Sequence, residues 1–181
     1  MSPDLIRTDG RRRRAVMESA LETFARVGYR GASMEAIARA ARISRPGLYF
    51  LFESKEALFR EAVSHVLVAD LDAVEEILAD DTRPFRDRLV SAFDRWAGRY
   101  VGPMVRYVPT VIADNPDLLD DVARAAPARF AGLLEAAVSG DAPNGAVIAE
   151  TLNSVSVGLI HQVSTREEYL ERLRRAVRLL T

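Results

Sequence analysis

Apolar residues recur every three or four positions along most of this chain, which is the spacing of one face of an α-helix. The first such segment, residues 11–27, carries Met17, Leu21 and Phe24 on that face. The longest follows Ser54 and holds its apolar face for roughly 37 Å of helix. No segment shows the alternation of apolar and polar residues that is typical of a β-strand. We therefore predict an all-α fold of about nine helices.

Small polar residues, glycine and proline predict where the first four helices begin and end. Gly28 ends the first helix. Pro46 is tolerated in the first turn of the third helix, because the early N–H groups there have no intrahelical partner. Three serines are predicted as N-caps: Ser33 before a helix at 34–41, Ser44 before one at 45–52, and Ser54 before the long fourth helix.

The second half of the chain divides at clear turn signals. A helix starts at Pro84 and runs to about Tyr100, and a capping box of Thr165 and Glu168 opens the last helix. Pro127 is expected to kink or break the helix in which it lies. The remaining predicted segments are 104–112, a helix from Asn115-Pro116 to Val138, a loop at 139–145, and helices at 146–163 and 166–180.

Charge is distributed unevenly along the 181 residues. Residues 1–60 hold twelve basic and seven acidic side chains, whereas residues 61–181 hold thirteen basic and nineteen acidic ones. This asymmetry indicates that only the front of the chain meets a polyanion. The chain has no cysteine, no membrane-length apolar run and no secretory leader, so we expect a cytoplasmic protein. The predicted organisation is a flexible tail at 1–10, a first domain at 11–53 and a helical domain at 54–181.

The second and third predicted helices, joined by the tight stretch 41–44, form a helix-turn-helix. Small Ala38 and Ala41 allow the two helices to approach closely, and Ile43 and Leu48 fill the angle between them. The third helix is too short to be stable alone. It therefore needs the first and fourth helices as support, with Phe24, Phe52 and Phe59 as the expected aromatic packing.

These residues resemble the TetR family of bacterial repressors over about Arg14 to Val63. The matching positions are Ala20-Leu21, Phe24, Gly28-Tyr29, Ser33-Met34-Glu35-Ala36-Ile37-Ala38, Ile43-Ser44-Arg45-Pro46-Gly47-Leu48-Tyr49, Phe52 and Ser54-Lys55-Glu56-Ala57-Leu58. The later residues match only in length and helical character. The resemblance implies a regulator that binds operator DNA and responds to a small molecule. Residues 11–53 would then be the DNA-binding domain, and residues 54–181 the helical effector-binding and dimerisation domain.

The resemblance also implies roles for individual residues. Arg45 becomes the candidate for reading guanine in the major groove. Leu51 and Arg42 depart from the family pattern, which often has histidine and glycine there; a positive φ at Arg42 would be costly. Residues implied to open the recognition helix are Ser44, Arg45, Pro46 and Gly47, and those implied to contact phosphates are Ser33, Tyr49 and Lys55.

Each of these positions also has a purely structural interpretation. The basic run Arg11, Arg12, Arg13 and Arg14 can follow the phosphates or enter the minor groove, or it can be a solvated helix start. Arg45 and Lys55 can be ordinary surface charges, and Tyr49 can pack its ring while its hydroxyl points outward.

The family resemblance implies a dimer formed by the last two helices. Residues 146–163 are apolar on nearly every side, so this helix must be buried on both sides, either by a partner subunit or within a monomer. A dimer would read a palindromic operator. The predicted effector is apolar or aromatic, because the candidate pocket residues are Phe93, Trp96, Tyr100, Met104, Tyr107, Phe130, Asn153 and His161. These aromatic residues can equally be ordinary core.

Other classes of function fit less well. The carboxylates fall on solvated helix faces, and no phosphate loop, nucleophile elbow or metal-ligand spacing accompanies them, so we expect no enzyme. His65 and His161 are the only histidines and are far apart, so we expect no metal site, and no cofactor is predicted. Two alternatives keep the fold: a regulator without a small-molecule ligand, controlled by a protein partner or its abundance, and an activator.

Overall fold

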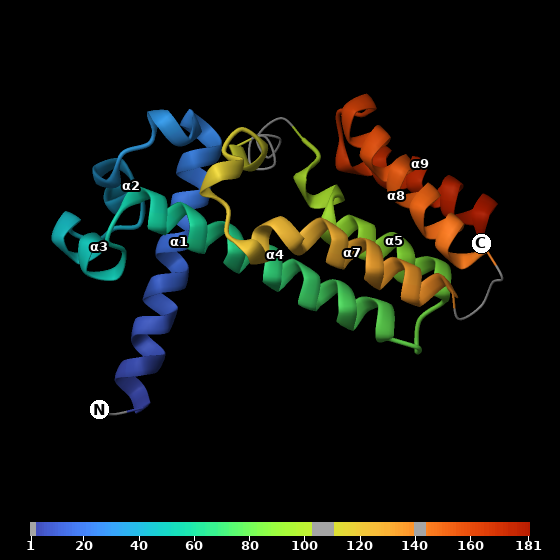
Figure 1. The fold of residues 1–181 in the computed structure, drawn as a ribbon, viewed down its shortest axis with the longest axis horizontal. Coiled ribbons are helices and arrows are strands. Elements are labelled where there is room, and N and C mark those ends of the chain that lie inside the picture. The colour runs from blue at the N-terminus through green and yellow to red at the C-terminus, as the bar shows by residue number, and fades with distance from the viewer. Residues whose placement is uncertain (1–2, 103–110, 140–143) are drawn as a thin grey trace. The chain divides into compact units, whose positions relative to one another are not determined.

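The computed structural model describes residues 3–102, 111–139 and 144–181, and every regular element in these ranges is a helix (Figure 1). This confirms the predicted all-α class. The elements are α1 (Pro3–Gly31), α2 (Met34–Ala40), α3 (Arg45–Leu51), α4 (Lys55–Ala79), α5 (Phe85–Trp96), the 3₁₀ turns η1 (Gly98–Tyr100) and η2 (Pro116–Leu118), α7 (Asp121–Ser139), α8 (Gly145–Gln162) and α9 (Arg166–Leu180).

The described chain forms two compact units. The first contains α1, α2, α3 and α4 as far as Val66, together with residues 111–123. The second contains α4 from Leu67, α5, η1, α7 from Arg124, α8 and α9. The sequence predicts a boundary after residue 53, just before α4 begins. The two compact units of the structure divide later, within α4, between Val66 and Leu67.

Serine caps begin the short helices of the first unit, as predicted. The side chain of Ser33 accepts a hydrogen bond from the Ala36 N–H at 3.1 Å, and Ser44 accepts one from Gly47 at the same distance. Ser54 caps α4 by accepting the Ala57 N–H at 3.0 Å. Each hydroxyl satisfies a backbone donor that the first helical turn leaves without a partner. Local sequence thus decides where these three helices start.

Two backbone conformations connect the elements of the first unit. Gly28 has φ 74°, which interrupts the regular path of α1 as predicted. Arg42, between α2 and α3, has φ 55° and is the one non-glycine residue with positive φ in the described chain. An L-residue with a side chain adopts this left-handed region only at a cost. The turn therefore uses an arginine where a glycine would be less strained.

Replacing Arg42 by glycine is expected to raise the free energy of unfolding by about 0.5–1 kcal/mol, because strain is relieved while the unfolded chain gains some freedom. Arg42→Val is expected to lower it by about 1–2 kcal/mol, because a β-branched residue fits this region worst. Chemical denaturation of both variants measures the difference. A glycine variant less stable than the valine variant would contradict the assigned strain.

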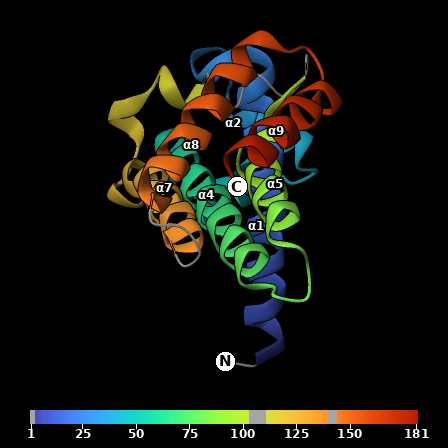
Figure 2. The ribbon, with the colours of Figure 1, turned by 90° about the vertical axis from the view of Figure 1, so that its right-hand side faces the viewer.

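Figure 2 shows the helices α4, α5, α7, α8 and α9, which supply the apolar core of the second unit. Buried residues from α4, α5, α7, α8 and α9 form one cluster, and α8 and α9 pack against each other. Tyr169 on α9 is fully buried, and its hydroxyl lies 2.7 Å from the Ser156 Oγ on α8. The Thr165 hydroxyl accepts the Glu168 N–H at 3.2 Å, which confirms the predicted cap of the last helix.

Three predicted helix boundaries are wrong. α1 begins at Pro3, so residues 3–10 are helical where a loose tail was expected; proline is well tolerated in a first turn, and Gly10 weakens a helix without ending it. α5 ends at Trp96 instead of about Tyr100, because η1 brings Gly98 against Tyr169, where a Cβ would lie only 2.9 Å from the ring. α7 starts at Asp121, not Pro116, because η2 is followed by an extended residue and Asp120 accepts the Ala123 N–H at 2.8 Å.

Two further expectations concern the same half of the chain. Pro127 lies within α7, and the helix continues past it to Ser139 without a break. The predicted segment 104–112 falls largely outside the described residues. In the part of the chain that is described, no helix has the length and apolar character needed to cross a membrane.

Candidate nucleic-acid interface

The short helix α3 has one buried face and one exposed face. Leu48 and Leu51 are 0% and 7% exposed and pack inward. Tyr49 and Phe50, on the other side, are 43% and 85% exposed. Arg45 and Pro46 in its first turn are also exposed. A helix this short is held by its buried face and its serine cap, and it offers the opposite face to a partner.

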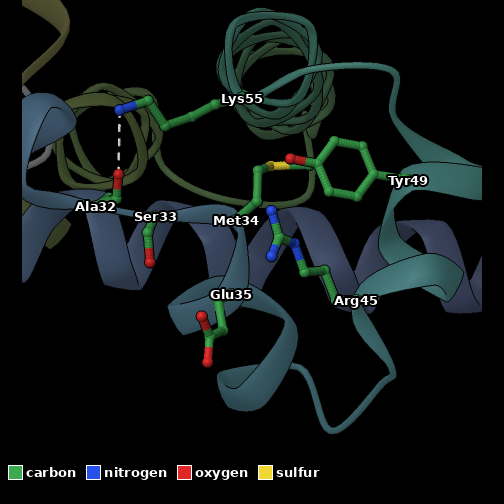
Figure 3. A pocket seen from close by; sticks show the side chains of 7 residues that line it. All are labelled: Ala32, Ser33, Met34, Glu35, Arg45, Tyr49 and Lys55. Atoms are coloured by element: carbon green, nitrogen blue, oxygen red, sulfur yellow. Dashed lines mark hydrogen bonds between the residues drawn. The ribbon is translucent and has the colours of Figure 1, made fainter.

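An open hollow of about 330 Å³ lies beside this exposed face (Figure 3). Arg45 and Tyr49 reach toward it from α3, and Lys55 reaches toward it from the start of α4. The Arg45 guanidinium carbon is 5.7 Å from the centre of the Tyr49 ring. The other lining residues are Ala32, Ser33, Met34 and Glu35. The structure therefore gathers four of the residues predicted to bind DNA, Ser33, Arg45, Tyr49 and Lys55, around one depression.

Lys55 also holds the end of α1, at residues 29–32. Its Nζ donates hydrogen bonds to the backbone oxygens of Tyr29 and Ala32, both at 3.0 Å, and lies 4.5 Å from the centre of the Tyr29 ring. An ammonium group has three N–H donors, so these two bonds leave one for another acceptor. Lys55 thus presents a positive charge at the hollow from a fixed position.

Three aromatic rings of the first unit, those of Phe24, Tyr29 and Phe59, pack against one another near Lys55. The Phe59 ring meets Phe24 edge-on at 5.2 Å and Tyr29 at 5.1 Å between ring centres. Burial raises the pKa of the Tyr29 hydroxyl, Glu56 raises it further and Arg60 opposes the shift, so this hydroxyl is neutral near pH 7. The expected packing of Phe24, Phe52 and Phe59 is observed as three buried rings.

The basic run at the start of the chain divides into two groups. Arg11, Arg12 and Arg14 are exposed, and a terminal nitrogen of Arg12 lies close to Gly47 on α3. Arg13 instead turns toward α4, where its partly exposed guanidinium binds the Glu61 carboxylate and the Leu51 carbonyl oxygen. The Arg13 guanidinium is thus paired within the protein, and a contact of this basic run with DNA stays a prediction.

The departure at Leu51 from the family pattern has a structural reason. Its side chain is buried, so an apolar residue suits a position where histidine is frequent in that family. A contact from this side chain to DNA would require it to leave the core.

The residues predicted to form an effector pocket are only partly brought together. Phe93 and Phe130 are buried and meet edge-on at 5.5 Å, and Trp96 stacks on Phe130 at 4.8 Å with 12° between the ring planes. On α8, Asn153 is half-buried and His161 is exposed. Met104 and Tyr107 lie outside the described residues. Phe93, Trp96 and Phe130 thus pack together as part of the core of the second unit.

Tyr100 does not share a helix face with Trp96, because α5 has ended before it. Its hydroxyl donates a hydrogen bond to the Asp70 carboxylate at 2.9 Å. The same carboxylate accepts ion-pair contacts from Arg95 at 2.8 Å and Arg99 at 2.6 Å. Burial raises the pKa of Asp70 although both arginines and Tyr100 act to lower it, and burial and the Asp70 charge raise the pKa of Tyr100. This buried cluster ties α4 to the end of α5.

Sequence reasoning missed three residues that the structure makes prominent. Phe50 is exposed because Leu48 and Leu51 take the buried side of α3, and this helical spacing could have revealed it. Asp70 is one of the carboxylates expected on a solvated helix face, and Glu61 was not singled out at all. Their partners lie 48 and about 30 residues away, and no local pattern marks such pairs.

Across residues 3–102, 111–139 and 144–181, no group of three or more histidine or carboxylate side chains is arranged to hold a metal ion. The lining of the hollow offers arginine, lysine and hydroxyl donors. Such groups recognise phosphate and base-edge acceptors.

Residues 16–62 match the family described as bacterial regulatory proteins, tetR family. The chain is 35% identical over 89 residues to the HTH-type transcriptional regulator RutR of Escherichia coli (strain K12), covering 44% of this chain and 42% of RutR. It is 26% identical over 78 residues to the HTH-type transcriptional regulator YhgD of Bacillus subtilis (strain 168), covering 43% and 40%. The alignments span about two fifths of the length of these relatives.

The fold is similar to solved structures over nearly the whole chain. A structure described as a TetR-family transcriptional regulator from Mesorhizobium loti has a TM-score of 0.75 and 19% identity, covering 95% of this chain and 96% of that one. AibR, solved in complex with isovaleryl coenzyme A and operator DNA, has a TM-score of 0.61 and 21% identity, covering 90% and 96%. At these identities the likeness shows a shared fold.

Proposed function

We propose that this chain is a DNA-binding transcriptional regulator of the TetR family and not an enzyme, which the match of residues 16–62 to that family and the likeness to RutR support. The observation that carries the proposal is the convergence of Arg45, Tyr49 and Lys55, from two helices, on one open hollow beside the exposed face of α3. The positive balance of residues 1–60 supports a polyanionic partner for this unit.

In the proposed complex, α3 enters the major groove with its first turn toward the base edges. Ser44, Arg45, Pro46 and Gly47 form that turn, and Arg45 can donate two parallel hydrogen bonds to guanine. Phe50 stands exposed on the same helix, and an apolar ring there suits contact with a thymine methyl group. Sequence preference would then come from an arginine and a phenylalanine together.

Phosphate contacts would come from the rim of the hollow. Lys55 has an N–H left for a phosphate oxygen, and the exposed Ser33 and Tyr49 carry hydroxyl donors. The exposed Arg11, Arg12 and Arg14 extend this donor set toward the N-terminal end of α1. These contacts fix position on the duplex and carry little sequence information.

Replacing Lys55 by alanine is expected to weaken binding to all duplexes alike and to lower the slope of log affinity against log salt by about one. Lys55→Arg keeps the charge and should retain the slope. Titrations with operator and random duplex at four salt concentrations provide the measurement. An unchanged slope in the alanine variant would show that Lys55 holds residues 29–32 and does not contact a phosphate.

The proposal as a whole is tested by selection from a random pool of duplex oligonucleotides with the purified full chain. Enrichment of one sequence class is expected. Recovery of an unenriched pool at low salt would contradict sequence-specific DNA binding.

We also propose a homodimer formed by α8 and α9, which would read a palindromic operator as a repressor. Apolar side chains support a partner on these helices: Val147 and Val157 on α8 are 63% and 52% exposed, and Leu179 on α9 is 85% exposed. Light scattering at micromolar concentration should give twice the chain mass. A reporter gene with the selected operator distinguishes repression from activation.

The proposed effector is a small apolar or aromatic molecule that binds in the second unit. In this proposal residues 54–181 form the effector-binding and dimerisation domain. The aromatic group Phe93, Trp96 and Phe130 supports this class of ligand, although these rings already pack together. A thermal-shift screen with such compounds detects binding as stabilisation. A genuine effector must also bind more weakly when operator DNA is saturating, because the coupling between two sites is reciprocal.

A further inference from the structure

Arg13 lies within the most basic run of the chain, and yet its guanidinium binds other residues of the same chain. Its Nε donates to one Glu61 carboxylate oxygen at 2.5 Å, and its Nη2 binds the other oxygen. Its Nη1 donates to the Leu51 carbonyl oxygen at 2.6 Å. Its guanidinium carbon lies 4.3 Å from the centre of the Phe52 ring. One side chain from α1 therefore contacts α4 and the last residues of α3.

These contacts act where α3 is weakest. A seven-residue helix cannot support itself, and the carbonyl groups of its last turn have no partners within the helix. Arg13 provides a charged donor to one of these carbonyls at Leu51. The two-pronged pair with Glu61 fixes the guanidinium, since arginine and a carboxylate match in a planar, double hydrogen bond. The end of α3 is thereby tied to both of its supporting helices.

We propose that Arg13 is a positioning residue: together with Glu61 it holds the C-terminal end of α3 in register for the major groove, and it does not neutralise a DNA phosphate. The inference rests on the proposed DNA-binding function. Its neighbours in the run, Arg11, Arg12 and Arg14, are exposed and keep the phosphate role.

The substitution Glu61→Gln distinguishes a positioning role of Arg13 from a purely electrostatic one, because the two roles predict opposite changes in DNA affinity. If Arg13 and its surroundings act only through charge, then Glu61→Gln removes a negative group near DNA and should tighten binding. If the pair positions α3, Glu61→Gln loosens the guanidinium and should weaken specific binding, as Arg13→Gln does. The double variant Arg13→Gln/Glu61→Gln should then be no weaker than Arg13→Gln alone, because both changes break one interaction.

The experiment measures affinity of the full chain for its selected operator and for a random duplex across a salt series. Arg13→Gln and Glu61→Gln are each expected to lose about tenfold in operator affinity, the size of one charge-assisted hydrogen bond at a half-exposed site. Their salt slopes should equal that of the unchanged protein, and binding to random duplex should change little. Arg12→Gln serves as the matched control and should lower the salt slope by about one.

Hydrogen exchange on the free protein provides a readout that does not depend on DNA. The Phe52 amide donates to the Leu48 oxygen at 2.9 Å, and its exchange should accelerate in Arg13→Gln and Glu61→Gln but not in Arg12→Gln. Arg13→Lys, which keeps the charge and loses the planar double contact, should behave like Arg13→Gln. A salt slope lowered by about one in Arg13→Gln, tighter binding by Glu61→Gln, or unchanged exchange at Phe52 would each overturn the proposal. An unchanged protein that prefers no duplex would instead refute the proposed function, and the exchange measurement would still decide the role of Arg13.

Discussion

Replacing Phe59 by alanine is expected to lower the free energy of unfolding by about 3–5 kcal/mol. The Phe59 side chain is completely buried and contacts the rings of Phe24 and Tyr29 edge-on. Alanine at this position removes those contacts and leaves a cavity between α4 and α1, which the surrounding helices can close only in part. Urea denaturation of the full chain, followed by circular dichroism, measures the loss.

Phe50→Ala is the matched control, since it removes the same atoms from a ring that is 85% exposed. It should change the free energy of unfolding by less than about 0.5 kcal/mol and should still weaken binding to operator. Equal destabilisation by the two substitutions would show that burial in this unit does not determine its stability.

Replacing Arg45 by alanine is expected to remove about 1–3 kcal/mol of discrimination between the selected operator and a duplex altered at one guanine. Arg45 lies in the first turn of α3 beside the Tyr49 ring, and a guanidinium group can donate two parallel hydrogen bonds to guanine. Affinity measurements on single-base variants of the operator identify the base pair at which preference disappears.

Arg39→Ala provides the control for charge alone. Arg39 is exposed on α2, 3.7 Å from Glu35, and it should affect all duplexes by a small and equal amount. If Arg45→Ala lost affinity equally for operator and altered duplex, Arg45 would be a phosphate contact and another residue, with Phe50 first, would read the sequence.

Much of the first unit follows from short-range patterns. Ser33, Ser44 and Ser54 mark three helix starts because a capping hydroxyl bonds to an amide only three residues ahead. Gly28 ends the regular part of α1, as its position in the sequence predicts, and Arg42 adopts a positive φ at a turn where similar proteins often have glycine. Boundaries that depend on distant packing were predicted less well, as at Trp96, where η1 meets Tyr169.

Helical spacing and caps within a few residues were enough to predict the helical class, the helix-turn-helix and the surface residues that could bind DNA. The folded chain was needed to show that Arg13 pairs with Glu61, that Lys55 holds residues 29–32, and that Asp70 is buried beside arginines. The difference is one of distance along the chain. An arginine in a basic run has the same local pattern whether it meets water, phosphate or a carboxylate 48 residues away, and folding alone brings that carboxylate to it.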